Sequence, residues 1–347
     1  MALAQETEAA AVERWGVSVL MRAGLRAEAA GAVCANLAYA EARGLRTHGF
    51  VRLGVYLERI EAGGIVVGAR PQIVRNGGAT AVVDCHDGPG AVGGAYAAEL
   101  AIRLAGEHGA GFVAGRNANH FGAAGWYAET IVEAGMVGLV ACNTDAVMAP
   151  PAGGRRVLGT NPIAIAVPGD AGVRPLLDMA TSGVAYGKLI VAAEEGSEIP
   201  LDWAVDAAGA PTSDPRAGLD GALLPAAGPK GFGLAYMIDM LAAMGGAQVS
   251  ADVHPLYGDR SIPQGLGFAM LAIDPEALEG ALFAARVRRL AEAVRSAGRA
   301  GQPAPLIPGE PEGRFAAEHA GRAPLLPGTR RTLATVGERY GVPFPLL

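Results

Sequence analysis

Several features that would place this chain in other classes of protein are scarce in its sequence. Only three of the 347 residues are cysteines, and Cys34, Cys85 and Cys142 are too scattered for a disulfide framework or a zinc site. Cys85 and Cys142 lie in apolar runs, which is typical of core residues. The six histidines also lack the close spacing of metal ligands. We therefore expect a protein without a metal site.

Runs of like charge and long apolar runs are missing as well. The formal net charge is -6 and no basic stripe occurs, which argues against a nucleic-acid-binding surface. No apolar run reaches about 18 residues, the lower end for crossing a bilayer. The N-terminus does not have the basic and apolar pattern of a signal peptide. We expect a cytoplasmic protein that binds neither nucleic acid nor membrane.

Aromatic residues are few, yet the chain is rich enough in apolar residues to build a large core. Aromatics make up 5% of the residues and hydrophobic residues 51%, so alanine, valine and leucine must do most of the filling. The 51 glycines and 23 prolines alternate with apolar runs and indicate tight turns rather than disorder. The length favours one large α/β body or two to three subdomains.

The stretch 110–162 carries the clearest functional pattern. Two apolar runs, 111–114 and 136–142, are typical of buried strands, and residues 124–134 between them have helical spacing. Polar residues follow each strand, among them His120, and ligands tend to bind where the strands of such a crossover unit end. The pattern predicts a site for a polar small molecule. The alternative is that His120 only caps the helix after it.

A second candidate site precedes the predicted helix 50–60. Arg52 and Tyr56 are four residues apart, so they share a helix face that can look back toward His48. A helix N-terminus disfavours an imidazolium, and an arginine can bind a carboxylate with two hydrogen bonds. This pairing suits a substrate with a carboxylate and an exchangeable oxygen. The alternative is a capping histidine with surface arginines.

Residues 88–93 spell the glycine pattern of a dinucleotide-binding Rossmann site, before a helix expected at 95–108. Pro89 removes an N–H where a pyrophosphate would need one, and the next strand ends in Arg116 instead of an acidic residue. We therefore interpret the segment as a glycine-rich helix start and expect a fold other than the Rossmann fold.

The remaining chain supplies further predicted elements. Helices are expected within 4–42 and at 183–193, 236–243, 278–297 and 327–340, strands at 80–84, 163–167 and 268–273, an extended linker at 65–79 and a proline-rich connection at 303–314. Residues 178–182 can bind a ligand or cap a helix. Lys230, in a glycine-flanked loop, can contact a phosphate or be solvated.

Seven short motifs occur together in the chain and suggest one family. They are Thr47-His48-Gly49 with Arg52 and Tyr56, Asn119-His120-Phe121-Gly122, Asn143-Thr144, Gly159-Thr160-Asn161-Pro162, Asp178-Met179-Ala180-Thr181-Ser182, Pro229-Lys230-Gly231 and Pro308-Gly309-Glu310. In this order and spacing the chain closely resembles the type-2 malate/L-lactate dehydrogenase family. Its relatives include sulfolactate and ureidoglycolate dehydrogenases, diketogulonate reductases and cyclic-imine reductases.

The resemblance implies a fold and a division of the chain. The fold is α/β, a mixed non-Rossmann sheet with helices on both faces, together with a helical subdomain from the two chain ends. Residues 1–75 would form a helical region with the His48 and Arg52 motif. Residues 76–310 would form the cofactor-binding body, and residues 311–347 a helical region that packs on the N-terminal helices.

The resemblance also implies a reaction: a homodimer that uses NAD or NADP to move a hydride to or from C2 of a small 2-hydroxy or 2-oxo acid. Matching positions give His48, His120 and Arg52 as catalytic, and Arg52, Tyr56, Thr160 and Asn161 as substrate-binding. Matching cofactor positions are His120, Gly122, Thr144, Arg174, Leu177, Asp178, Met179, Ala180, Lys230, Pro308, Gly309 and Glu310. The cofactor choice, the enantiomer and which histidine is the acid/base stay open.

The sequence leaves other functions open. Thr47 stands where most relatives have serine, and Arg46 where an acidic or small residue is frequent, which can alter the preferred substrate charge. Oxidation of a ureido acid or reduction of a cyclic imine is the alternative within oxidoreductases. A catalytically silent binding protein of the same fold is the alternative from another class.

Overall fold

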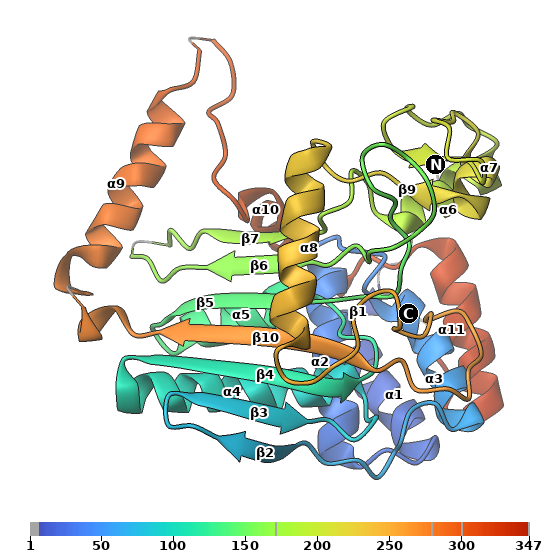
Figure 1. Cartoon of the computed structure of the whole chain (residues 1–347). Helices are drawn as coiled ribbons and strands as arrows, with labels where there is room; N and C mark the ends of the chain where they lie inside the picture. The colour runs from blue at the N-terminus through green and yellow to red at the C-terminus, as the bar shows by residue number, and fades with distance from the viewer. Residues whose placement is uncertain (1–6, 171, 279, 300, 346–347) are drawn as a thin grey trace.

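The computed structural model describes residues 7–170, 172–278, 280–299 and 301–345, and Figure 1 shows its elements. A seven-stranded mixed sheet organises the molecule. Its strands in spatial order are β2 (Gln72–Asn76), β3 (Thr80–Asp84), β4 (Ala110–Ala118), β10 (Leu266–Ile273), β5 (Val137–Cys142), β6 (Ile163–Ala166) and β7 (Leu176–Met179). Among the described strands of this sheet, only β3 and β4 pair in parallel. Because β10 lies antiparallel between β4 and β5, these two strands end at the same edge of the sheet.

Helices cover both faces of this sheet. On one face α4 (Gly90–His108) and α5 (Ala124–Glu133) pack on apolar side chains that alternate along β4, β5 and β10, such as Val113, Val140 and Met270. On the other face α8 (Pro229–Ala243) lies over β4, β10 and β5, and its Ile238 packs on Ala141 and Ile163. Figure 1 shows α8 in front of the strands and α4 and α5 behind them.

The two ends of the chain meet in a helical unit at one edge of the sheet. It contains α1 (Ala9–Arg22), α2 (Ala27–Ala42), η1 (Phe50–Arg52), α3 (Leu53–Ala62) and α11 (Pro327–Tyr340), and the short strands β1 (Thr7–Glu8) and β11 (Arg322–Ala323) pair. Trp15 contacts Phe344 edge-to-face at 4.8 Å and donates to the carbonyl of Val342. The predicted packing of the last helix beside the N-terminal helices is confirmed.

A third, smaller hydrophobic core lies outside the main sheet. It joins α6 (Tyr186–Glu195), α7 (Pro215–Asp220), β8 (Ala204–Val205) and β9 (Ala222–Leu223) around Leu189, Met148 and Leu223. At the other side of Figure 1, η2 (Pro275–Ala277) and η3 (Gly280–Leu282) lead into α9 (Phe283–Ser296), which projects from the body, and α10 (Glu310–Glu318) follows. Within the described residues, no helix combines the length and the hydropathy that a bilayer crossing needs.

The fold class is confirmed, while several element boundaries differ from the prediction. The expected linker 65–79 contains β2, and the connection 303–314 contains the start of α10. α8 begins at Pro229 instead of residue 236, because a proline in the first turn suits a helix start, so Lys230 lies in a helix and not in a loop. The helix expected at 278–297 begins at Phe283, after two 3₁₀ turns. The domain division at residues 75 and 310 stays a prediction.

The glycine-rich segment 88–93 serves close packing. α4 starts at Gly90 and not at residue 95, as expected, since tertiary contacts override the low helix propensity of glycine. A Cβ on Gly90 would lie 2.2 Å from the Asn119 carbonyl oxygen and 2.4 Å from that of His120. A Cβ on Gly93 would lie 2.4 Å from Cys85 Sγ. These glycines let α4 approach the sheet, which agrees with rejecting the Rossmann reading.

We expect Gly90→Ala to destabilise the fold by about 2 kcal/mol or more, because the new methyl group would displace backbone carbonyls that cannot rotate away. Gly31→Ala is the control: a methyl group added to this helical glycine would meet no described atom of a neighbouring element within 4 Å, so alanine should raise stability by about 0.5–1 kcal/mol. Urea unfolding of both variants measures the two changes. Equal stabilisation would contradict the packing role of Gly90.

Candidate active site

A cavity of about 520 Å³ lies at the edge of the sheet where β4, β5 and β7 end. The helical unit of the chain ends closes it on one side and the α6–α7 unit on another. Residues from both units and from the sheet line it; they include Thr47, His48, Arg52, His120, Gly122, Thr144, Asp145, Arg156, Thr160, Asp178, Met179, Ala180, Tyr186, Gly187, Tyr257 and Gln264. The site therefore forms only when distant parts of the chain fold together.

His48 and Arg52 reach the cavity from the turn between α2 and α3. The Thr47 hydroxyl lies 3.0 Å from His48 Nδ1, and Arg52 Nε donates to the Thr47 carbonyl at 2.6 Å. Arg52 Nη1 also donates to the Tyr257 hydroxyl. The turn itself is held by buried Glu41, whose carboxylate accepts the backbone N–H of Phe50 at 3.1 Å. These contacts fix the imidazole and the guanidinium relative to each other.

His120 follows β4 and lies beside His48. The two ring centroids are 5.8 Å apart and the ring planes are inclined by 25°. The Tyr56 hydroxyl is 2.6 Å from His120 Nδ1, and the backbone N–H of Gly122 donates to the same nitrogen at 3.3 Å. Because an N–H can only donate, Nδ1 accepts, and the neutral ring carries its proton on Nε2.

The backbone around His120 is held by amide side chains from other elements. Gln264 Oε1 accepts the backbone N–H of His120 at 2.9 Å, and Asn119 Nδ2 donates to the Asp87 carbonyl at 2.7 Å. From α2, Asn36 Oδ1 accepts the backbone N–H of Ala123 at 3.0 Å. Gln264, Asn119 and Asn36 are all about 1% exposed. His120 is thus positioned by buried hydrogen bonds and does not act as a simple helix cap.

Both imidazoles are held in the neutral form. Burial, and next the positive charge of Arg52, lower the pKa of His48 to about 3. Burial also lowers the pKa of His120 well below its ordinary value, and Arg52, His48 and Arg59 act in the same direction. The sequence predicted a neutral His48 from its place near a helix start, whereas burial and the neighbouring arginine are the causes found here.

Thr144 and Thr160 form one wall of the cavity, and Asn161 supports this wall from behind. The Thr144 hydroxyl accepts the backbone N–H of Thr160 at 2.9 Å. Asn161 Oδ1 accepts the backbone N–H of Thr144 at 3.0 Å, and Asn161 Nδ2 donates to the Ala235 carbonyl. Asn161 is fully buried and its backbone is in the left-handed region, with φ of 26°. Its amide therefore holds the wall without facing the cavity.

Asp178 marks the far end of the main cavity, near a second cavity of about 360 Å³. Its carboxylate accepts the backbone N–H of Gly125 at the start of α5, at 2.8 Å, and burial raises its pKa to about 6. The second cavity is lined by residues that include Arg174, Arg295, Gly309, Glu310, Glu312 and Arg314. The carboxylate of Glu312 acts electrostatically on Asp178, so the two cavities are neighbours along β7.

The predicted site residues divide into three groups. His48, Arg52, His120, Gly122, Thr144, Thr160, Asp178, Met179 and Ala180 line the main cavity. Arg174, Gly309 and Glu310 line the second cavity. Neither lining includes Leu177, Lys230 or Pro308, while Tyr56 and Asn161 reach the site through His120 and Thr144. The individual roles of these residues stay predictions.

The structure adds residues that sequence patterns did not assign to the site: Asp145, Arg156, Tyr257 and Gln264. Asp145 belongs to the polar run after β5, so the end of that strand was a signal for it. Tyr257 arrives on a loop held by Arg59, which is fully buried and donates to the carbonyls of Leu256 and Ile262. Arg59, which shares a helix face with Arg52 and Tyr56, is therefore a buried structural residue and not a surface arginine.

The comparison with known families identifies the chain. Residues 7–327 match the family described as malate/L-lactate dehydrogenase. The chain belongs to this family. It is 40% identical to the L-sulfolactate dehydrogenase of Methanocaldococcus jannaschii over 299 residues, which are 86% of each protein. The solved sulfolactate dehydrogenase from that organism superposes with a TM-score of 0.91 and 36% identity, and 98% of each chain is covered.

Two other relatives bear on the cofactor. The ureidoglycolate dehydrogenase (NAD(+)) of Escherichia coli K12 is 37% identical over 257 residues, 74% of this chain and 73% of the relative. The (2R)-3-sulfolactate dehydrogenase (NADP(+)) of Chromohalobacter salexigens is 36% identical over 270 residues, 77% of each protein. The predictions of the family, of a 2-hydroxy acid dehydrogenase and of NAD or NADP as cofactor are confirmed. Among the described residues no cluster of metal ligands is found.

Tyr56→Phe should lower kcat about 10-fold and change the KM for the 2-oxo acid little, because His120 Nδ1 loses the stronger of its two donors and the ring loses its fixed proton position. Steady-state kinetics measures both constants. Tyr96→Phe, on α4 outside the cavity lining, is the control for removing a tyrosine hydroxyl. A Tyr56→Phe enzyme with the wild-type kcat would show that the hydroxyl does not set the His120 ring.

The depressed pKa of His48 predicts a loss of stability in acid. The unfolded chain takes up a proton near pH 6.5, whereas the folded protein resists protonation down to about pH 3. The contribution of the neutral His48 to the free energy of unfolding is therefore fully present above pH 6.5 and is lost as the pH falls toward 3. Between about pH 7 and pH 4 the Tm of His48→Gln should fall by several degrees less than that of the wild type. His108→Gln, at the exposed end of α4, is the control, and equal falls in all three proteins would reject the prediction.

Proposed function

We propose that this protein catalyses the reversible, NAD- or NADP-dependent oxidation of a small 2-hydroxy acid of the malate, lactate or sulfolactate type to the 2-oxo acid. The observation that supports this most is the pair of neutral imidazoles, 5.8 Å apart, beside the Arg52 guanidinium in one cavity. A 2-hydroxy acid presents a carboxylate next to an exchangeable oxygen, which is the pair of groups that such a cavity can bind.

Arg52 is proposed to bind the substrate carboxylate. Its Nε and Nη1 are already held by Thr47 and Tyr257, so the guanidinium plane is fixed before the substrate arrives. A guanidinium can form paired hydrogen bonds to a carboxylate that an ammonium cannot reproduce. Bound carboxylate would also offset the positive charge that now disfavours protonation of His48.

His48 and His120 are proposed to handle the oxygen on C2 in different ways. The Thr47 hydroxyl can accept from His48 Nδ1–H, which leaves the lone pair on Nε2 free to take the hydroxyl proton. His120 has the opposite arrangement, since Nδ1 accepts and Nε2–H can donate to the same substrate oxygen. The proton leaves the substrate for His48, and the hydrogen bond from His120 holds the oxygen in place.

The residues of the two cavities fit a dinucleotide. The exposed guanidiniums of Arg174 and Arg314 line the second cavity and can bind phosphate, and Gly309 lies with φ of 87° against the backbone of Leu176. Thr144 and residues 178–180 would hold the nicotinamide end, whereas Arg174, Gly309 and Glu310 would hold the adenosine end. When bound, the nicotinamide exchanges the hydride with C2 of the substrate.

His48→Ala should lower kcat by about 100-fold or more with cofactor binding nearly intact, because it removes the group that exchanges the proton. His120→Ala should lower kcat less and raise the KM for the 2-oxo acid. Absorbance at the nicotinamide band measures turnover, and cofactor fluorescence measures binding. Wild-type turnover by His48→Ala would move the acid/base role to His120. Failure of the wild type to bind NADH or NADPH would favour a catalytically silent binding protein.

We further propose that the protein is a cytoplasmic homodimer joined through α8. The outer face of this helix exposes a row of apolar side chains, Leu234, Met237, Met240 and Met244, with Met237 58% exposed. Figure 1 shows no described element in front of α8 on that side. A row of large apolar side chains is costly to leave in water and is typical of a surface that another chain covers.

In sedimentation velocity the wild type should run as a dimer, at twice the 35.1 kDa mass of the chain. Met237→Asp should shift it to the monomer, since a carboxylate in the centre of the interface would be desolvated without a partner. Leu290→Asp, at an even more exposed leucine on the projecting helix α9, is the control and should stay dimeric. A monomeric wild type, or a dimeric Met237→Asp variant, would contradict this interface.

A further inference from the structure

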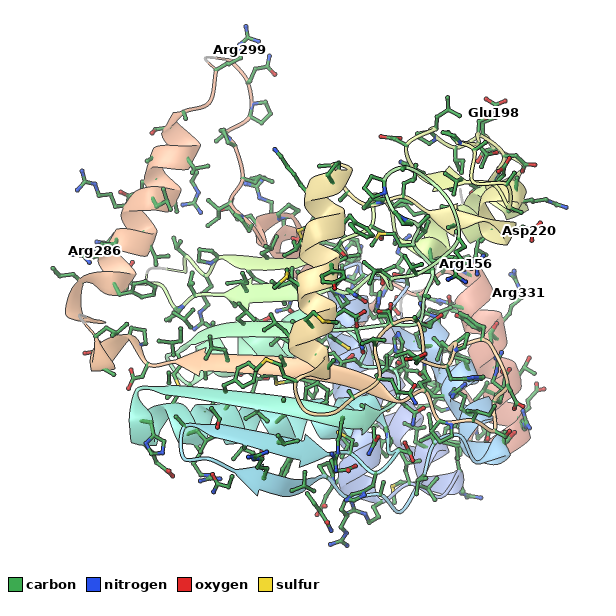
Figure 2. The ribbon with its side chains drawn as sticks, in the orientation of Figure 1. Arg156, Glu198, Asp220, Arg286, Arg299 and Arg331 are labelled. Carbon is green, nitrogen blue, oxygen red and sulfur yellow. The ribbon has the colours of Figure 1, made fainter. Side chains whose placement is uncertain are left out.

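Arg156 is a second guanidinium in the main cavity that no motif assigns to the reaction. It lies in the connection between β5 and β6, and Figure 2 shows it next to the α6–α7 unit. Its Nε donates to the Gly221 carbonyl and its Nη2 to the Leu219 carbonyl. Both acceptors are backbone atoms at the end of α7, so within the described part of the chain the head group is fixed by carbonyls and not by a salt bridge. Nη1 has no hydrogen-bond partner among the residues described.

Arg52, Asp145 and Arg156 share this end of the cavity. The carboxylate of Asp145 lies within the electrostatic reach of both guanidiniums, which lower its pKa, although burial raises that pKa by more. The nearby imidazoles of His48 and His120 are neutral. Two positive groups thus face at most one negative group, and the substrate end of the cavity keeps a net positive charge. A substrate with one carboxylate would pair with Arg52 and bring no second anionic group to Arg156.

We propose that Arg156 forms a second anion subsite, which binds the far carboxylate or sulfonate of a substrate with two anionic groups. The inference deepens the proposed function and rests on it: Arg52 holds the carboxylate next to C2, and Arg156 holds the acidic group at the other end. The preferred substrates are then 2-hydroxy and 2-oxo acids of the dicarboxylate or sulfonate class. Lactate-like monoacids are the poorer substrates.

The fixed head group favours recognition of an anion over a purely structural role. A guanidinium that is already held by two backbone carbonyls loses little conformational entropy when an anion binds to its free Nη1 edge. A charge-assisted hydrogen bond in a partly buried site is worth about 10- to 100-fold in affinity. This factor is the discrimination that we expect between a substrate with the second anionic group and one without it.

The first experiment compares oxaloacetate with 2-oxobutanoate, which carries a methyl group where oxaloacetate has its far carboxylate. The wild type, with whichever nicotinamide cofactor it binds, should show a kcat/KM about 10- to 100-fold higher for oxaloacetate. Equal or higher kcat/KM for 2-oxobutanoate overturns the second subsite but leaves the dehydrogenase function standing. If the enzyme turns over neither of these acids, and also fails with sulfopyruvate, a ureido acid and a cyclic imine, the proposed function itself is contradicted.

The second experiment assigns the preference to a residue. Arg156→Met should remove most of the preference for oxaloacetate by raising its KM and should leave kcat/KM for 2-oxobutanoate within about twofold. Arg155→Met, the exposed neighbour outside the cavity lining, is the matched control and should behave as the wild type. Arg52→Lys should weaken both acids, because both carry the carboxylate next to C2. A preference unchanged in Arg156→Met overturns the assignment.

Arg156 also ties the connection before β6 to α7, so its loss can weaken folding. The activity of Arg156→Met toward 2-oxobutanoate and its Tm report on the integrity of the fold. If that variant unfolds, titration calorimetry with the wild type decides: malate should bind about 10-fold or more tightly than 2-hydroxybutanoate. Equal affinities for the two hydroxy acids overturn the subsite.

Discussion

The site depends on two imidazoles that the fold keeps neutral next to a fixed positive charge. His48 comes from the helical unit of the chain ends and His120 from the end of β4, and both are desolvated beside Arg52. Desolvation and the arginine act together, since each disfavours an imidazolium. A neutral imidazole is the form that can accept a hydroxyl proton. The proposed catalysis therefore requires the two units to meet in a fixed arrangement, and buried amides such as Asn36 and Gln264 provide this junction.

The mixed sheet explains why so many distant segments meet at one edge. Strand β10 lies antiparallel between β4 and β5, so the loops after these two strands emerge side by side with the start of β10. β7 ends at the same edge and runs between the two cavities. The sheet thus gives one surface on which a carboxylate, a reacting carbon and an extended cofactor can be bound next to one another. Glycine in α4 serves this arrangement by close packing and leaves phosphate binding to other residues.

Charge organises the cavity along its length. The substrate end of the main cavity holds Arg52 and Arg156, which both act electrostatically on Asp145. Asp178 and Glu312 lie toward the second cavity. In the proposed reaction this separation would orient a substrate with its acidic groups away from Asp178. The imidazole pair and Arg52 belong to the motifs by which the sequence resembles this family. Arg156 lies outside those motifs, and it is the residue through which we propose that this chain selects its substrate.

The sequence alone determined the elements whose signals are local. The crossover unit around α5 was predictable because its apolar runs and helical spacing lie within one short stretch, and so was the family, because its motifs are short and ordered. The tertiary structure decided what depends on distant partners: the place of β10, the helical start at Gly90, the tautomer of His120 and the part of Arg156 in the cavity. Each of these rests on a contact between residues far apart in the chain, and no local pattern of side chains records such a contact.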